Sequence, residues 1–474
     1  MLKKNKIAII GGGVAGSTSA IHLAQLGLEV TLFEKESSLI SGPPFCHLHA
    51  GGNLYREISN KQCITLLKQS IDFAKFYPFI VDYRPTVIAL PITDKQSPNN
   101  LIERLELLKK EYQSLIEDDP LNNILGKSDN YYKLYTREKI EQLKQYSTVT
   151  KPSTSDEWII PLAHHLDLDK IQFPLILVQE YGLNLFRLAS GVTLTLQKMN
   201  NVTLKTKTEI TNIIKEQKGW RVEFNNQYDN FDYIINASGF RTGKIDDMIG
   251  VPCKRMVEFK SAYVSYWEEE SETIFPELIV HGERGTPQGM GQFTPYPNGY
   301  FQLHGMTNDI TLYSDGLVAN TPQSCQPELK KDFMKKIEVS WSKEETYQRT
   351  NSAIKHLSKF IPMFSKATVA SKPLFGAQQI PGDDPTLRVA EVSFPTKGYA
   401  RCEIVKVSSV IDMVDSITKD LIELNLLEKK SQVEISLSFL ENLEENRVQE
   451  YAKEIAKERG YPASLAQRNI INQL

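Results

Sequence analysis

The alternation of hydrophobic and polar positions is clearest at the start of the chain. Residues 7–10 form an apolar run that predicts a buried strand. A glycine-rich turn follows, and small and apolar residues then recur at helical spacing as far as Gly27. A second apolar run, residues 30–33, predicts another strand and ends at Glu34. The order strand, glycine turn, helix and strand predicts a unit that binds the ADP half of a dinucleotide.

The rest of the chain shows both helical and extended patterns. Helical periodicity marks residues 60–77, 101–117, 180–196 and 341–360. Extended patterns mark residues 83–92, a strand pair within 201–224, a buried strand within 231–240 and a β-rich stretch over 251–345. Beyond residue 422 the chain is charged and helical and carries no chemical motif, which favours a packing extension.

Composition narrows the class of protein. The chain has 474 residues and is too long for one ordinary domain. Its net charge of −3 provides no overall field that would attract nucleic acid. Five cysteines are scattered without metal-type spacing, which predicts a reducing compartment and therefore a cytoplasmic protein. No stretch approaches the ~20 apolar residues of a membrane span, which leaves only peripheral membrane contact open.

The glycines of the first turn have distinct physical roles. Gly11 allows the tight turn, Gly13 lets the backbone approach a pyrophosphate, and Gly16 allows close packing of helix on sheet. The following helix offers unpaired N–H groups and a positive dipole end to the phosphates. A carboxylate at Glu34 can accept both ribose hydroxyls and would repel a 2′-phosphate. The candidate cofactor-binding residues of this unit are Gly11, Gly13, Ala15, Gly16, Glu34 and Lys35.

The order of three motifs resembles a known family. The N-terminal GGGVAG…FEK, a mid-chain strand ending in NASG and a C-terminal glycine turn are similar to those of the FAD-dependent oxidoreductases of the D-amino-acid oxidase and glycerol-3-phosphate dehydrogenase superfamily. The resemblance covers most of residues 1–420. It implies FAD as cofactor and an α/β fold, in which a Rossmann-like FAD-binding domain is interleaved with an antiparallel-sheet (α+β) substrate domain.

The resemblance also implies where the domains begin and end. The FAD-binding domain is expected to be discontinuous, over residues 1–82, 157–250 and 366–422. The substrate or cap domain is expected over residues 83–156 and 251–365, and residues 423–474 form a C-terminal helical extension.

The loop after Glu34 adds candidate flavin contacts. Its segment CHLHAGGNLYRE, residues 46–57, is similar to the His-Gly-Gly loop of the glycerol-3-phosphate dehydrogenases, which passes beside the pyrophosphate and the flavin. His49 matches best and His47 is the second choice. In some family members a histidine of this loop carries the flavin covalently; for this chain, non-covalent contact is favoured. Candidate cofactor contacts in the loop are His49, Ala50 and Gly51.

Later segments add further cofactor contacts by the same resemblance. Ala237 and Gly239 match a small-residue turn near the ADP moiety, where a side chain would collide with the dinucleotide. Ile210 matches a strand whose backbone contacts adenine. Gly398 and Tyr399 precede an expected helix, and in the family backbone N–H groups there face the pyrimidine end of the flavin.

Candidate catalytic residues follow from the need to move a proton as well as a hydride. A histidine suits proton removal because its pKa lies near neutrality. His49 and His304 stand in motif-like contexts, and His304 ends an expected strand that faces the flavin in the family. Many members carry Gly-x-Arg-Pro where this chain has residues 376–379, GAQQ, so an amide replaces a cation. Arg401 is the candidate to supply the missing positive charge, as a third catalytic residue.

The leading hypothesis is an FAD-dependent dehydrogenase or oxidase that takes a hydride from a small polar hydroxy- or amino-compound to flavin N5. A flavin-dependent monooxygenase is an alternative, although its usual Gly-Asp motif is replaced by residues 389–392, VAEV. A flavin-binding protein without turnover is another, and an NAD-binding dehydrogenase fits the first motif alone. The partner is a small-molecule substrate, and the electron acceptor (oxygen, a quinone or a protein) stays open.

Overall fold

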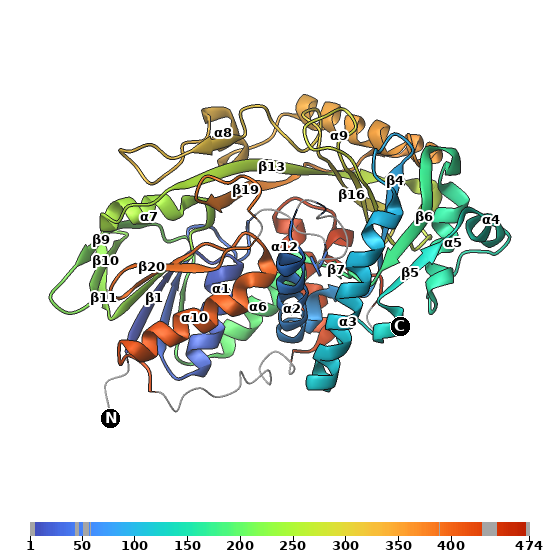
Figure 1. Ribbon diagram of the computed structural model, residues 1–474. Helices are drawn as coiled ribbons and strands as arrows, with labels where there is room; N and C mark the ends of the chain where they lie inside the picture. Colours follow the sequence, from blue (N-terminus) through green and yellow to red (C-terminus); the bar gives the residue numbers. More distant parts are fainter. Residues whose placement is uncertain are drawn as a thin grey trace.

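Two large β-sheets organise the computed structural model, which describes residues 5–42, 47–50, 56, 58–387, 389–428 and 443–470. Figure 1 shows the first sheet at the lower left and the second at the upper right, with strand β13 running along the top. The first sheet has six strands in the order β20-β21-β12-β1-β2-β8. The second has the path β17-β13-β16-β15-β14-β4-β6-β5, with β18 and β19 paired to β13.

The six-stranded sheet is parallel except for one edge strand. The pairs β1–β12, β1–β2, β2–β8 and β12–β21 are parallel, and β20 pairs with β21 in the antiparallel sense. Its strands are β1 (Lys6–Ile10), β2 (Glu29–Phe33), β8 (Val202–Lys205), β12 (Tyr233–Asn236), β20 (Val392–Thr396) and β21 (Tyr399–Cys402). Its strands come from the start, middle and end of the sequence.

Helices pack on this sheet and on one another. They are α1 (Val14–Gln25), α2 (Asn60–Phe76), α6 (Leu185–Lys198), α10 (Val410–Glu423) and α12 (Glu445–Glu458). Helix α1 contacts α6 and α10, and α12 packs against α6. Beside them, β9 (Ile210–Lys215), β10 (Trp220–Phe224) and β11 (Gln227–Phe231) form a small antiparallel sheet next to α7 (Thr242–Ile249).

The second sheet is antiparallel apart from the pair β4–β14. Its strands are β4 (Thr86–Pro91), β5 (Tyr132–Tyr135), β6 (Ile171–Val178), β13 (Arg255–Tyr266), β14 (Glu277–Val280), β15 (Gly291–Tyr296), β16 (Tyr300–Gly305), β17 (Leu317–Ala319), β18 (Thr368–Val369) and β19 (Leu374–Pro381). Its helices are α3 (Ile102–Asp118), α4 (Arg137–Leu143), α5 (Ser155–His165), α8 (Lys331–Glu338) and α9 (Lys343–Leu357). The short pair β3 (Val81–Asp82) and β7 (Gly182–Leu183) lies outside this sheet.

Most segments follow the sequence pattern, and the differences have local causes. The helix expected over 180–196 begins only at Leu185, because Gly182–Leu183 pairs as β7 and Asn184 caps the helix. Strands β6 and β19 pair within the second sheet, although their residues fall in ranges expected for the FAD-binding domain. The C-terminal segment is an integral part of the core, since Val448, Ala452 and Ile455 of α12 are almost completely buried.

Candidate active site between the two sheets

The glycine turn after β1 leaves no space for side chains at two of its positions. Gly11 has a φ of +103°, and a Cβ there would lie 2.4 Å from the carbonyl oxygen of Ala237. A Cβ at Gly16 would lie 1.9 Å from the carbonyl oxygen of Gly11. The turn, the first turn of α1 and the end of β12 therefore pack against one another through backbone alone.

Gly13 differs from these two glycines because the space in front of it is open. It is the N-cap of α1, and a Cβ there would meet no described protein atom within 4 Å. Among the described residues, no side chain caps this helix end. The first N–H groups of α1 thus meet open space at the carboxyl edge of a parallel sheet, an arrangement that fits a pyrophosphate.

Glu34 closes the turn from the end of β2. Its buried carboxylate accepts hydrogen bonds from the backbone N–H groups of Gly12 and Glu36, each at 2.7 Å. Lys35 instead forms a surface ion pair with Glu36 at 3.2 Å. Two backbone donors hold the carboxylate of Glu34 in place, and each of its oxygens keeps a further lone pair for a ribose hydroxyl.

Arg459 ties the C-terminal segment to the same turn. Its guanidinium donates hydrogen bonds to the carbonyl oxygens of Leu39 and Ile40 and to the hydroxyl of Ser38. The N–H of Ile40 in turn donates to the carbonyl oxygen of Gly12 at 3.0 Å. The sequence motifs do not contain Arg459, and only the fold brings it to this end of the site.

The mid-chain candidates lie at the same sheet edge as the glycine turn. Ala237 follows β12, and its N–H donates to the carbonyl oxygen of Ile10 at 2.8 Å. Gly239 has a φ of +59°, and the chain turns there toward α7. Ile210 is buried at the start of β9, in one hydrophobic cluster with Ile10. The structure therefore brings three of the sequence-predicted segments together around the carboxyl ends of β1, β2 and β12; their contacts with a cofactor stay predictions.

Gly398 and Tyr399 lie at the opposite end of the same strands. Gly398, with φ +77°, forms the hairpin turn between β20 and β21, and its carbonyl oxygen accepts from the N–H of Ile234 at the start of β12. The helix expected after Tyr399 is α10, which begins only at Val410, because Tyr399–Cys402 first form the strand β21. The carboxyl end of β21 is followed instead by residues 403–409.

The histidine loop joins the two sheets through side-chain contacts. His47 Nδ1 lies 2.7 Å from Oε1 of Glu277, which begins β14 of the second sheet. His49 Nε2 lies 3.2 Å from Nζ of Lys406, in the segment that follows β21 of the first sheet. The two imidazole rings are 4.6 Å apart. Ala50 beside them is completely buried, and Gly51 lies outside the described residues.

Glu277 is the centre of a completely buried cluster of charged and polar groups. Arg84 donates to one carboxylate oxygen, while Gln292 donates to the other at 2.6 Å, beside His47. Burial alone would raise the pKa of Glu277, but the charges and hydrogen bonds of His47 and Arg84 outweigh it and lower the pKa to about 2. The carboxylate is therefore ionised throughout the physiological pH range.

His304 lies beside this cluster in a different state. It is on β16, directly opposite Gln292 of β15. Burial lowers its pKa to about 4, although the charge of Glu277 opposes this shift. His304 is therefore neutral at physiological pH, which suits a hydrogen-bonding role; its predicted catalytic role is not decided by this geometry.

The sequence model of a family described as FAD dependent oxidoreductase (DAO) matches residues 6–372. The chain belongs to this family of FAD-dependent oxidoreductases. It is accordingly a flavoenzyme with FAD as its cofactor, and the open N-terminus of α1 with the glycine turn fits the pyrophosphate of that cofactor. A search of curated protein sequences finds no match.

Solved structures with the same fold align with almost the whole length of the flavoenzyme. L-proline dehydrogenase from P. horikoshii is 14% identical with a TM-score of 0.56, over 92% of this chain and 96% of that chain. Glycine oxidase from Geobacillus kaustophilus is 12% identical with a TM-score of 0.53, over 92% and 98%. Glycerol-3-phosphate dehydrogenase from Bacillus halodurans, complexed with FAD, is 12% identical with a TM-score of 0.56, over 98% and 74%. At these identities the likeness shows the fold.

Arg401 of the flavoenzyme belongs to a second buried cluster, around Asp246 of α7. Its Nε lies 3.0 Å from Asp246 Oδ1, which also accepts a hydrogen bond from the Tyr399 hydroxyl at 2.6 Å. Arg401 Nη2 donates to the carbonyl oxygen of Pro252. Burial raises the pKa of Asp246, and the attraction of Arg401 and Arg255 only partly opposes this. The guanidinium of Arg401 is thus engaged inside the protein, and its role toward a substrate stays a prediction.

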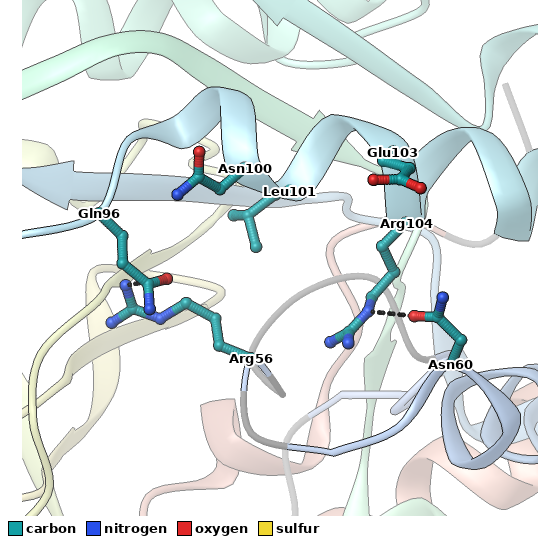
Figure 2. A pocket seen from close by; sticks show the side chains of 7 residues that line it. All are labelled: Arg56, Asn60, Gln96, Asn100, Leu101, Glu103 and Arg104. Atoms are coloured by element: carbon teal, nitrogen blue, oxygen red, sulfur yellow. Dashed lines mark hydrogen bonds between the residues drawn. The ribbon is translucent and has the colours of Figure 1, made fainter.

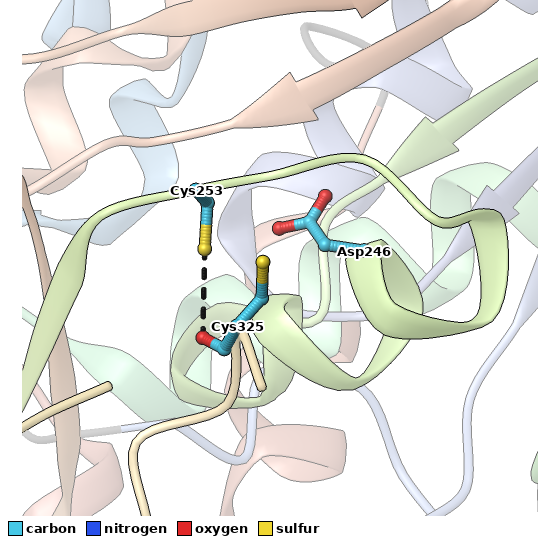
Figure 3. Close-up of side chains that lie close together, drawn as sticks. All are labelled: Asp246, Cys253 and Cys325. Carbon is cyan, nitrogen blue, oxygen red and sulfur yellow. Dashed lines mark hydrogen bonds between the residues drawn. The ribbon is translucent and has the colours of Figure 1, made fainter. Parts of the chain in front are cut away.

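Two cysteines adjoin this second cluster (Figure 3). One oxygen of Asp246 and the sulfur atoms of Cys253 and Cys325 all lie within 4.8 Å of one another. The Cys253 thiol donates to the carbonyl oxygen of Cys325, and burial raises the pKa of the Cys325 thiol to about 12. The adjoining guanidinium groups of Arg255 and Arg401 disfavour a cation here.

A surface pocket of about 200 Å³ lies near the start of α2 and α3 (Figure 2). It contains two arginines, but both are already paired. Arg56 forms two bonds of 3.0 Å with Asp94, and Arg104 donates to the Asn60 side chain at 3.0 Å.

The sequence motifs missed the partners of the histidine loop. Glu277, Arg84 and Lys406 lie far from the loop in sequence, and none belongs to a recognisable motif. The sequence offered one signal for Glu277 and Arg84, since each is a charged residue beside or within an apolar strand pattern and such a residue needs a partner when it is buried.

Among the described residues, no helix is both long and apolar enough to cross a bilayer.

Proposed function

We propose that this flavoenzyme oxidises a small amino compound at the junction of its two sheets. The observation that carries the proposal is the position of the histidine loop. His49 contacts Lys406 in the segment that follows β21 of the first sheet, and His47 contacts Glu277 of the second sheet. Titratable groups from both sheets thus meet at one place, where they can take up the proton of an ammonium substrate. When bound, FAD supplies the hydride acceptor for this chemistry.

The charges around the loop favour a substrate that carries a negative group. Lys406 and His49 together can offer hydrogen-bond donors to a carboxylate. Gln378 and Gln379 stand in the stretch where many family members have an arginine. Gln379 is bonded to the carbonyl oxygen of Cys402, so it braces the segment after β21. We therefore assign substrate carboxylate binding to the loop and to Lys406, rather than to that stretch of β19.

The names of similar structures support an amino compound. Two of the three described above, the proline dehydrogenase and the glycine oxidase, act by name on amino acids. The third is a glycerol-3-phosphate dehydrogenase, which keeps a small hydroxy compound as the second candidate. A hydroxy substrate would use the same histidines for proton removal, so the geometry alone favours neither nitrogen nor oxygen.

Anaerobic reduction of the purified holoenzyme tests the proposal. Amino acids and secondary amines form one panel, and hydroxy acids with glycerol phosphate form the other. We expect at least one amino compound to bleach the visible flavin band. Bleaching by hydroxy compounds alone would replace the proposal with the second candidate. No bleaching by either panel, with FAD fully bound, would favour a flavin-binding protein without turnover. Admitting oxygen or a quinone to the reduced enzyme then tests the electron acceptor.

A further inference from the structure

We propose that Glu277 is the positioning residue of His47: it fixes the imidazole with a proton on Nδ1, so that His47 takes up the substrate's proton through Nε2. The inference rests on the proposed function, since it assigns the fate of a proton from an amino compound. Glu277 itself does not touch the substrate and acts only through His47.

The geometry around Glu277 leaves its carboxylate a single orientation. One oxygen faces His47 Nδ1 at 2.7 Å and accepts from Gln292 at 2.6 Å, while the other accepts from Arg84. All four side chains are at least 96% buried. Arg84 is held in turn, with its Nε 3.5 Å from the buried carboxylate of Asp82. Bonds from three sides hold both oxygens of Glu277.

An ionised carboxylate can only accept hydrogen bonds. Gln292 Nε2 also lies 3.2 Å from His47 Nδ1, but it already donates to Glu277 at 2.6 Å, and the shorter contact of 2.7 Å between Glu277 and Nδ1 requires a hydrogen on Nδ1. In the neutral imidazole this proton leaves the lone pair on Nε2, and in the cation both nitrogens carry hydrogen. Proton exchange by His47 accordingly takes place at Nε2, whichever other group that nitrogen contacts.

Charged and titratable groups face His47 from the loop and from the second sheet. The ionised Glu277 stabilises a cationic imidazole, while Arg84 opposes it. On the loop itself, the ring of His49 packs at 4.6 Å and is paired with Lys406. From the second sheet, His304 on β16 is neutral at physiological pH. Lys260 on β13 adds a positive charge, which helps to lower the pKa of His304.

The proposed step balances in protons and electrons. An ammonium substrate gives one proton to Nε2 of His47, which leaves a neutral amine and an imidazolium opposite Glu277. The nitrogen lone pair then forms a C=N bond as the C–H electron pair departs with its hydrogen to FAD. The organic product is an iminium ion, and the enzyme retains one additional proton on His47 until reoxidation.

Nitrogen-15 NMR of the cofactor-free protein tests the tautomer without any catalysis. The His47 signals are assigned by their loss in a His47→Gln variant. We expect a hydrogen on Nδ1 in the neutral ring. A neutral ring with its hydrogen on Nε2 would overturn the proposal, even if the enzyme oxidises amino compounds.

Two variants separate the charge of Glu277 from its position. In Glu277→Gln, the pH at which His47 loses its second proton should fall by about one unit or more, and flavin reduction should slow at least roughly tenfold at neutral pH. Glu277→Asp keeps the charge and should restore the pH midpoint better than the rate. The matched control is Asp420→Asn, which removes a carboxylate bonded to buried Tyr233 at 2.5 Å outside this cluster.

The outcomes distinguish this inference from the proposed function. An unchanged midpoint and reduction rate in Glu277→Gln, with full flavin content, would refute the role of Glu277 and leave the proposed function intact. Loss of FAD affinity alone, with a normal His47 midpoint, would also refute it, because that is the result of a structural role. If no amino compound reduces the flavin, the NMR experiment still decides the tautomer.

Discussion

The two ends of the site, the glycine turn and the histidine loop, are held together by different kinds of contact. At the glycine turn, backbone groups of the turn and of the end of β12 make most of the contacts, and a Cβ would meet backbone atoms at Gly11 and Gly16 but no described atom at Gly13. At the histidine loop, buried side chains such as His47, Arg84 and Glu277 come from distant parts of the chain. The first end is a local structure that binds a constant cofactor, whereas the second is a tertiary structure that can specialise.

The largest effect is expected from a side chain at Gly13. The Cβ of a Gly13→Val side chain would meet no described protein atom within 4 Å, so we expect the fold to persist while the pyrophosphate is blocked. We expect a folded, colourless protein, as measured by circular dichroism and by visible absorption. Gly42→Ala, in an exposed loop with similarly open space, is the control and should retain its flavin. Normal flavin content in Gly13→Val would contradict the assignment of the turn.

The second effect concerns stability at the other end. The pKa of Glu277 is about 2 when folded, against an ordinary value of 4.5, so its stabilisation is present above pH 4.5 and is lost as pH falls toward 2. Glu277→Gln should lower the free energy of unfolding by about 3 kcal/mol at neutral pH. Denaturant titrations across this pH range should show the difference from wild type shrinking in acid. The exposed Glu283→Gln is the control, and a difference that does not vary with pH would argue against an ionised Glu277.

His304 should contribute to acid sensitivity in the same direction as Glu277, but over a higher pH interval. Its folded pKa of about 4 lies below the ordinary 6.5, so the protein loses stability as pH falls from 6.5 toward 4 and the buried ring must become charged. A neutral His304→Gln variant should lose less stability than wild type over that interval. The exposed His164→Gln serves as control. Equal acid sensitivity of wild type and His304→Gln would mean that His304 is solvated or already charged.

The smallest effect is expected from Arg459, a side chain that is distant in sequence from the glycine turn. Arg459→Met keeps much of the side-chain volume but removes the bonds to residues 38–40. Because Arg459 does not itself form the turn, we expect the Kd for FAD to rise only about five- to tenfold, which corresponds to about 1 kcal/mol, the net contribution of one ordinary hydrogen bond. Fluorescence titration of the apoprotein with FAD measures this, with the exposed Lys457→Met as control. A complete loss of binding would show that this end also depends on tertiary contacts.

The same contrast explains what the sequence could predict. The strand, turn and helix at residues 6–34 follow from local periodicity and from glycines with fixed steric reasons, and the family resemblance adds the order of the domains. The pairing of His47 with Glu277 brings a loop residue against the first residue of β14, far away in the sequence, and no local pattern encodes this contact. The sequence analysis placed Gly398 and Tyr399 before a helix, whereas Tyr399–Cys402 form the strand β21 before α10 begins, because so short a segment carries no periodicity that separates a strand from a helix start.

The edges of the domains were hard to predict for a similar reason. Strands β6 and β19 are adjacent in sequence to segments of the first domain, but their partners β4 and β13 belong to the second sheet. An extended pattern predicts that a strand exists and not which neighbour it pairs with. The sequence likewise did not show that α12 is part of the core, because this depends on its packing against α6, which only the fold brings beside it.

The most direct test of the account is anaerobic mixing of the purified, FAD-loaded enzyme with the panel of amino compounds while the visible flavin band is recorded. The account predicts that at least one amino acid or secondary amine bleaches the band, and that Glu277→Gln slows this bleaching at neutral pH. Full FAD occupancy with no bleaching by any amino compound would contradict it.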